Sequence, residues 1–257
     1  MKRLAQIIRR MGFIKDQQGV MNRFIRESSG WETHLEKTRS FISGSFHQTK
    51  AETVAVLGSG WLLDVPLDDL IKRFRIIYLV DIHHPIQIRK KTAAMNRVEL
   101  VEEDLTGGAV VQIWERLRKS KKPMQEGLLN GQINLETPLA GIHPDAFISV
   151  NVLDQLDAFL CDYVMKQRRF QQESLAPLRA TIQAFHLDWI KKKPGCLITD
   201  TIEEVVDRKG NRTSKRLLYT DLPDGIRYDN WRWDFDTTGT YHPGSRTHME
   251  VQAVEWS

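Results

Sequence analysis

The spacing of apolar positions along the chain changes near residue 50. Before that point the apolar residues repeat at helical intervals, in two stripes formed by Leu4, Ile7, Ile8 and Met11 and by Trp31, Leu35, Thr38 and Ile42. After it, short β-branched runs alternate with helical segments, a pattern typical of βαβ units around a parallel sheet. We therefore predict a helical extension or lid over residues 1–50, docked on an α/β domain over residues 51–257.

Five predicted strands alternate with five predicted helices in this domain. The strands are Val54–Gly58, Ile76–Ile82, Val98–Glu103, Ala146–Asn151 and Cys196–Thr201, and the helices lie near 65–73, 85–95, 107–119, 154–169 and 174–191. Residues 120–144 are interpreted as a long loop or a partly helical insertion. After residue 202 no helix of useful length fits, and the turn at 209–211, the aromatic segment at 231–233 and the alternating run after Met249 predict a β-rich tail.

Composition agrees with a folded protein that has one sizeable core. The chain has 257 residues, 41% of them hydrophobic, and a net charge of +4 spread along its length, which is too weak to indicate nucleic acid. Lys191, Lys192 and Lys193 are interpreted as a solvated helix end. Cys161 and Cys196 show no paired spacing, so we expect two core thiols rather than a disulfide or a zinc site. We expect a cytoplasmic protein without a membrane span or signal peptide, and the oligomeric state stays open.

Chemistry-bearing residues follow the first three predicted strands. Gly58-Ser59-Gly60 lies between a strand and a helix, where glycine lets the backbone turn tightly and approach a ligand. Asp64 and Pro66 then predict a helix start, with Asp64 as its cap. Asp81 ends the second strand, where an acid can accept hydrogen bonds from both ribose hydroxyls. Asp104 ends the third strand, where it can accept from the adenine amino group while Leu105 covers the ring. Together they predict a site for an adenosine moiety.

The order of these motifs over about residues 54–202, with the β-rich tail, resembles the class I S-adenosylmethionine-dependent methyltransferases. The resemblance implies a Rossmann-like fold, with a seven-stranded, mostly parallel sheet that ends in an antiparallel hairpin, and S-adenosylmethionine as cofactor. It implies that Gly58, Ser59 and Gly60 line the methionine part, Asp81 and Ile82 the ribose, Asp104 and Leu105 the adenine, and that Asn151 lies beside the sulfonium and the substrate.

The glycine loop departs from the family pattern at two positions. Val56 stands where the family usually has an acid, and Trp61 stands where a third small residue is usual. These departures leave open a methyltransferase-like binding or scaffold module that has lost catalysis. A nicotinamide-dependent oxidoreductase is the other alternative, although Leu63 replaces the third glycine of the dinucleotide fingerprint.

The methyl acceptor has no sequence signature, because methyl transfer depends mainly on positioning. We expect a small-molecule acceptor, with a protein side chain as the alternative, and neither a nucleic-acid nor a membrane partner. The candidates for the substrate side are Asn151, Gln155, His143 and His47. His83 and His84 are interpreted as part of the cofactor loop rather than a metal site, because adjacent residues rarely bind one ion.

Overall fold

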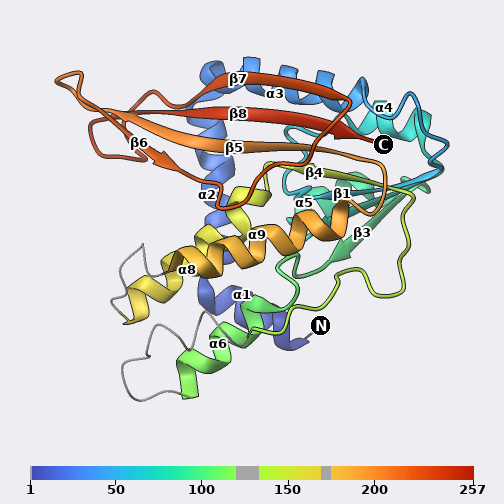
Figure 1. The fold of residues 1–257 in the computed structure, drawn as a ribbon, viewed down its shortest axis with the longest axis horizontal. Helices are drawn as coiled ribbons and strands as arrows, with labels where there is room; N and C mark the ends of the chain where they lie inside the picture. The colour runs from blue at the N-terminus through green and yellow to red at the C-terminus, as the bar shows by residue number, and fades with distance from the viewer. Residues whose placement is uncertain (1, 120–132, 169–174) are drawn as a thin grey trace.

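A computed structural model describes residues 2–119, 133–168 and 175–257, which form helices around one mixed sheet (Figure 1). The helices are α1 (Lys2–Met11), α2 (Phe13–Arg26), α3 (Ser28–Ser43), α4 (Leu67–Arg73), α5 (Ile86–Thr92), α6 (Ala109–Lys119), α8 (Leu153–Arg168) and α9 (Ala176–Ile190). The strands are β1 (Thr53–Leu57), β2 (Ile76–Asp81), β3 (Val98–Glu102), β4 (Ala146–Val150), β5 (Gly195–Val206), β6 (Arg212–Arg216), β7 (Arg227–Asp236) and β8 (Arg246–Trp256). Residues 120–132 of the predicted insertion lie outside the described part, and 133–145 form an irregular connection.

The sheet has the strand order β3-β2-β1-β4-β5-β8-β7, in which the first five strands are parallel and the last two antiparallel. This confirms the predicted fold class, and the structure adds an eighth strand. β5 is 12 residues long. Its first half pairs with β4, and its second half extends beyond β4 and pairs with β6. The tail therefore lengthens the sheet at the same end at which the parallel strands finish.

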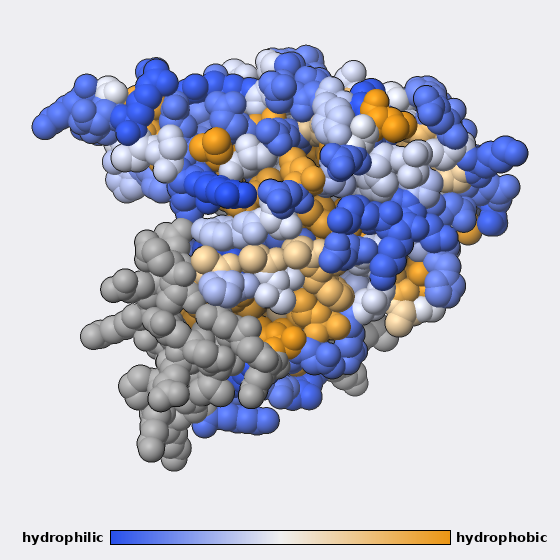
Figure 2. Space-filling model, in the orientation of Figure 1, coloured by the Kyte–Doolittle hydropathy of each residue, from blue (hydrophilic) through white to orange (hydrophobic). Residues whose placement is uncertain are grey.

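Two hydrophobic clusters cover the two faces of the sheet. α1, α6, α8 and α9 pack on one face, and α3 and α4 on the other. Every residue of β1 and β4 is buried, as expected for central parallel strands, whose sequences are continuous apolar runs for this reason. The face in Figure 2 is mostly hydrophilic over the antiparallel strands, and hydrophobic side chains gather near its middle, around α9.

The N-terminal helices contribute to both clusters. The predicted stripe of α1 is docked, since Ile7, Ile8 and Met11 are buried. On the opposite face, the Trp31 indole of α3 packs against the rings of Trp233 and Phe235 in β7. In the described ranges no helix is both long and apolar enough to cross a membrane.

A buried ion pair joins α8 to α9. Arg179 Nη1 donates to Asp157 Oδ2 at 2.7 Å, and both side chains are almost fully buried. Gln183 Nε2 donates to the other Asp157 oxygen at 2.6 Å and to the carbonyl of Leu217 at 3.0 Å, which also ties the tail to these helices. Cys161 and Cys196 are buried free thiols, as expected.

Removing one partner of this pair should destabilise the fold strongly. Arg179→Ala leaves the Asp157 carboxylate buried without a counter-ion, and we expect a loss of about 3–5 kcal/mol in the free energy of unfolding in urea. The matched double variant Arg179→Met, Asp157→Leu removes both charges and should recover most of that loss. A double variant as unstable as Arg179→Ala would contradict this account.

Candidate functional site

The glycine loop is shaped by close backbone packing. The N–H groups of Gly58 and Ser59 both donate to the carbonyl of Val80, at 3.0 and 3.2 Å. Gly58 has φ of +81°, and a Cβ there would lie 2.6 Å from the Cβ of Val152. Gly60 also has positive φ, +40°, yet a Cβ there would meet nothing closer than 3.7 Å. Glycine is therefore required at position 58, where a side chain would collide with Val152. At position 60 there is free space beside the backbone, on the side that faces Asp81.

Asp81 lies at the carboxyl end of β2, as predicted, and touches the glycine loop. Its Oδ2 accepts a hydrogen bond of 2.8 Å from the N–H of Gly60. Burial raises the pKa of Asp81 to about 6, and the nearby Glu102 carboxylate acts in the same direction. Ile82 beside it is partly buried against the core.

Asp104 follows β3 and keeps one oxygen without a partner. Its Oδ1 accepts hydrogen bonds from the Thr106 amide at 3.0 Å and the Thr106 hydroxyl at 2.5 Å. Its Oδ2 is buried and has no hydrogen-bond partner among the described residues. Buried acceptors are rarely left unpaired in folded proteins, so this oxygen is suited to a donor from a ligand. Leu105 beside it is buried.

Asn151 follows β4 in the left-handed backbone region, with φ of +47°. Its amide nitrogen donates to Asp64 Oδ2 at 2.7 Å and lies 3.1 Å from His34 Nε2. Trp231 Nε1 donates to the other ring nitrogen of His34, at 3.1 Å. Burial lowers the pKa of His34 to about 3, so the ring is neutral at physiological pH. Asn151 is thereby held by groups from α3 and from the loop after β1.

The assignment of Asp64 as a helix cap is wrong. Pro66 occupies the N-cap position of α4, and no side chain caps that helix. The carboxyl of Asp64 is directed instead to Asn151, and burial raises its pKa. The sequence showed an acid shortly before a proline, which is the usual pattern of a helix start. No local signal distinguished it from a site residue.

Two further buried carboxyl groups, Asp154 on α8 and Asp200 on β5, lie near Asp64 and were not foreseen. Burial raises the pKa of Asp154 to about 7, with the neighbouring Asp157 adding to the shift. Burial, then Asp154, raises the pKa of Asp200 well above its usual value, and Asp200 Oδ1 has no partner in the described part of the chain.

The site is therefore rich in buried carboxyl groups, of which Asp64 is stabilised by the charge of Arg39. The described residues provide no ion pair with lysine, arginine or histidine for any of five carboxyl groups, which are Asp64, Asp81, Asp104, Asp154 and Asp200. Four of them end or follow strands β1 to β4, and Asp200 lies on β5 just beyond its last pairing with β4, so all five gather at one edge of the parallel strands. Strongly perturbed carboxyl groups gathered in one place are typical of functional sites.

Helix α2 spans this edge. Trp61 Nε1 donates to the carbonyl of Gln17 at 2.7 Å, and Gln17 Nε2 donates to the carbonyl of His83 at 2.9 Å. Trp61, one departure from the family pattern, is thus a residue that anchors α2. Val56, the other departure, is fully buried in the core, where an acid would lack a partner.

The remaining candidates for the substrate side, Gln155, His47 and His143, lie at opposite edges of the sheet. Gln155 is exposed on the first turn of α8, and its side-chain amide donates to the carbonyl of Asn151 at 2.7 Å. His47 and His143 are exposed or partly exposed and precede the amino ends of β1 and β4. Since that is the opposite edge, the structure does not bring these two histidines to the site, and we exclude them from it.

The two histidines contact residues of β3. The His83 ring lies 3.1 Å from Glu102 Oε1, and the buried His84 ring contacts the carbonyl of Val101. No group of three or more potential metal ligands occurs within residues 2–119, 133–168 and 175–257.

No protein-family model matches this sequence, and no curated protein matches it. Two solved structures are similar in fold. The methyltransferase domain of bacterial CtHen1 is 14% identical, with 86% of this chain and 100% of that chain covered and a TM-score of 0.33. The 23S rRNA methyltransferase ErmE is 11% identical, with 86% and 68% covered and a TM-score of 0.29.

The strand order, with five parallel strands and antiparallel C-terminal strands, is that of a Rossmann-like sheet, as expected. The expectation of a small-molecule acceptor without a nucleic-acid partner was wrong. The comparison that overturns it is ErmE, a methyltransferase that is named for its action on 23S rRNA.

The buried carboxyl groups should reduce stability at neutral pH. Because the folded-state pKa of Asp154 is raised to about 7, its contribution to stability is present at acidic pH and is lost as the pH rises from about 4 through 7. Asp154→Asn removes this loss. We expect its melting temperature at pH 8 to exceed that of the unmodified protein by about 4 °C or more.

The pH dependence separates this cause from a general effect on packing. The difference in melting temperature should shrink between pH 7 and pH 4. The exposed control Asp221→Asn should show no such gain at pH 8. A constant difference across this range would count against ionisation of Asp154 as the cause.

Proposed function

We propose that this protein is an S-adenosylmethionine-dependent methyltransferase. The observation that carries the proposal is the set of five carboxyl groups without ion-pair partners among the described residues around the glycine loop. Buried carboxyl groups favour a cationic ligand, because its charge stabilises their ionised forms, and this cofactor carries a sulfonium cation. A dinucleotide would instead place an anionic pyrophosphate against the same carboxyl groups, which electrostatics disfavours.

The residues at this edge fit the parts of the cofactor. Asp81 would accept hydrogen bonds from the ribose hydroxyls, and Ile82 follows it. The unpartnered Oδ2 of Asp104 would accept from the adenine amino group, with Leu105 against the ring. The open backbone at Gly60 would leave room for the methionine part, beside Gly58 and Ser59.

When bound, S-adenosylmethionine would supply an electrophilic methyl group. The protein's own contribution would be to position the acceptor and exclude water, which can account for much of the acceleration of a bimolecular transfer. Asn151 is the residue best placed for positioning, because its amide is fixed by Asp64 and its backbone is held in the left-handed region. Gln155 bonds to the Asn151 carbonyl and would flank the acceptor.

Asp81→Ala tests the cofactor site directly. The unmodified protein should bind S-adenosylhomocysteine in calorimetry, and the variant should bind it at least about tenfold more weakly, because hydrogen bonds to a charged acceptor are removed. Glu99→Ala, on the exposed side of the neighbouring β3, removes one carboxylate away from this edge and should leave the affinity unchanged. Binding of NAD in place of S-adenosylhomocysteine would reject the proposal.

Acid should weaken the same interaction. The pKa of Asp81 is raised to about 6, and only its ionised form accepts from both hydroxyls, so the affinity should decrease as the pH falls from 7.5 to about 5.5. Asp81→Asn should remove most of this decrease. Equal pH profiles for the two proteins, measured by calorimetry, would show that Asp81 is not the ribose acceptor.

A further inference from the structure

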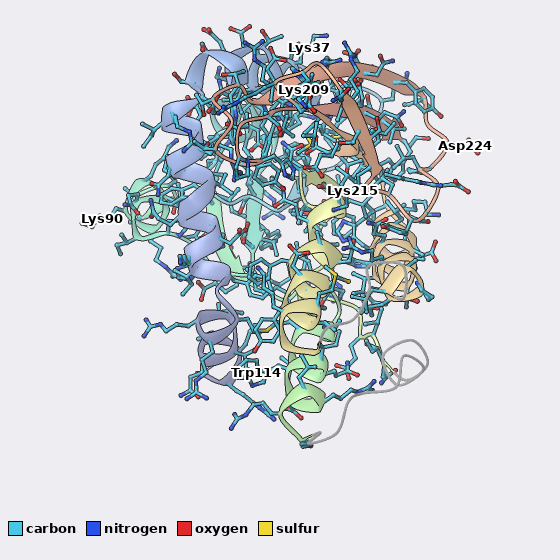
Figure 3. The ribbon with its side chains drawn as sticks, turned by 90° about the vertical axis from the view of Figure 1, so that its left-hand side faces the viewer. Lys37, Lys90, Trp114, Lys209, Lys215 and Asp224 are labelled. Atoms are coloured by element: carbon cyan, nitrogen blue, oxygen red, sulfur yellow. The ribbon has the colours of Figure 1, made fainter. Side chains whose placement is uncertain are left out.

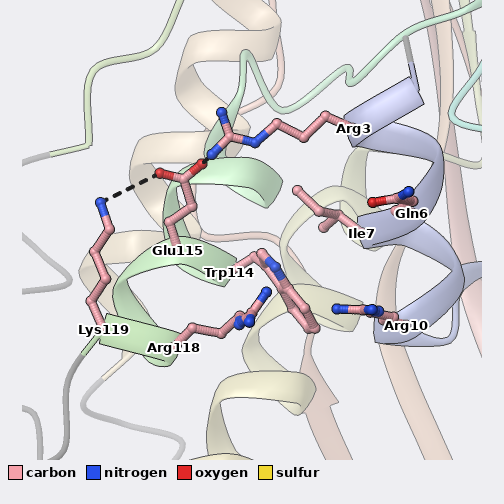
Figure 4. Close-up of a pocket in the computed structure, with 8 residues that line it drawn as sticks. All are labelled: Arg3, Gln6, Ile7, Arg10, Trp114, Glu115, Arg118 and Lys119. Carbon is pink, nitrogen blue, oxygen red and sulfur yellow. Dashed lines mark hydrogen bonds and ion pairs between the residues drawn. The ribbon is translucent and has the colours of Figure 1, made fainter.

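A groove of about 430 Å³ lies between α1 and α6, outside the proposed cofactor site (Figure 4). Its lining residues are Arg3, Gln6, Ile7, Arg10, Trp114, Glu115, Arg118 and Lys119. Trp114 projects from α6 toward α1, and its ring lies within 5.8 Å of the Arg118 guanidinium (Figures 3 and 4). The groove therefore combines an aromatic ring with several cations.

The groove is strongly basic. Four of its lining side chains are cationic, and Glu115 is the single acid among them. Glu115 is already engaged, because it forms ion pairs with both Arg3 and Lys119. The cations of α1 and those of α6 are separated in sequence by more than 100 residues, so the local charge arises only after folding brings the two helices together. Such a surface attracts a polyanion.

The apolar side of α1 is not available to a lipid. Ile7, Ile8 and Met11 are buried in the core, so only the polar side of this helix is exposed. Membrane-surface helices bind by inserting an apolar face, and α1 has already used that face for docking. Charge complementarity combined with an indole in the groove favours a ligand with both phosphates and aromatic bases.

Both walls of the groove lead to the proposed cofactor site. α6 begins at Ala109, shortly after Asp104, and the helical rise places Trp114 and Lys119 roughly 8 and 15 Å along it. α1 continues through Gly12 into α2, whose Gln17 contacts both Trp61 and the His83 carbonyl at the strand edge. A nucleic-acid segment of a few nucleotides is long enough to reach from the groove along α6 to the carboxyl ends of the parallel strands.

We propose that the groove between α1 and α6 binds an unpaired segment of RNA that carries the methyl acceptor, with its phosphates on Arg10 and Arg118 and a base stacked on Trp114. RNA is the occupant of choice, because its loops and bulges present unpaired bases that stack on aromatic rings and guanidinium planes. This inference deepens the proposed function and rests on it for the methyl transfer, but the binding itself does not need the cofactor.

The test is fluorescence anisotropy with a labelled single-stranded RNA of mixed sequence, about 12 nucleotides long, and the full-length protein. Arg10→Ala with Arg118→Ala should weaken binding about tenfold or more. The same variant should reduce the slope of log affinity against log salt by roughly 0.7 for each phosphate that is no longer neutralised. Trp114→Ala should weaken binding about fivefold or more with an unchanged salt slope.

The matched control is Lys192→Ala with Lys193→Ala, which removes the same charge just beyond the C-terminal end of α9 and should leave RNA affinity nearly unchanged. The arginine and lysine variants should keep the melting temperature of the unmodified protein, and every variant, Trp114→Ala included, should keep its affinity for S-adenosylhomocysteine when measured well below its own melting temperature. A decrease of affinity in the control as large as in the groove variants would overturn the groove as the binding site.

The outcomes separate the two proposals. S-adenosylhomocysteine binding without RNA binding overturns the groove proposal and leaves the methyltransferase proposal standing. RNA binding without S-adenosylhomocysteine binding supports the groove and rejects the enzyme. Equal affinity for double-stranded DNA, or binding only to vesicles of phosphatidylserine and phosphatidylcholine, would overturn the assignment to unpaired RNA.

Discussion

Parallel pairing of β3, β2, β1, β4 and β5 is the constraint on which the site depends. Parallel strands finish at the same edge of a sheet, and their interiors are covered on both faces, so polar side chains are tolerated mainly where the strands end. Asp81, Asp104 and Asn151 follow this rule, and Asp200 lies where β5 passes the end of β4. Polar and ionisable groups that are distant in the sequence are thereby concentrated in one place, at a cost in stability, and such clusters are typical of functional sites.

The sequence was sufficient for the fold class and for the positions of Asp81 and Asp104 at the ends of their strands. The β1, β2, β3 and β4 strands were predicted to within a residue or so, because β1, β2 and β4 are short apolar runs and β3 alternates apolar with charged residues. Asp81 and Asp104 were found because a position at the end of a buried strand can be read from local pattern alone. The antiparallel tail was visible in its alternation and in its lack of helical spacing.

The rest depends on long-range contacts that no local pattern contains. His34 lies on a helical face that otherwise indicated only core packing, and its partner Asn151 is 117 residues away. Strand β6 is exposed at all five positions, so it has no hydrophobic pattern, and it forms only because the second half of β5 offers an unpaired edge. The positive charges of α1 and α6 looked evenly spread along the sequence for the same reason, because the two helices come together only in the folded chain.

The contacts that hold helix α2 at the strand edge determine how fast this helix can open. None of its side chains is fully buried, and Gln17 holds it to the strand edge through hydrogen bonds to two loops. Phe13, Val20 and Phe24 of this helix pack on the core only with partly buried side chains, so it opens at a lower free energy than the sheet beneath it. The residence time of a nucleoside at this edge would then be set by the opening of one helix, and mutations at Trp61 or Gln17 would alter exchange rates without altering the sheet.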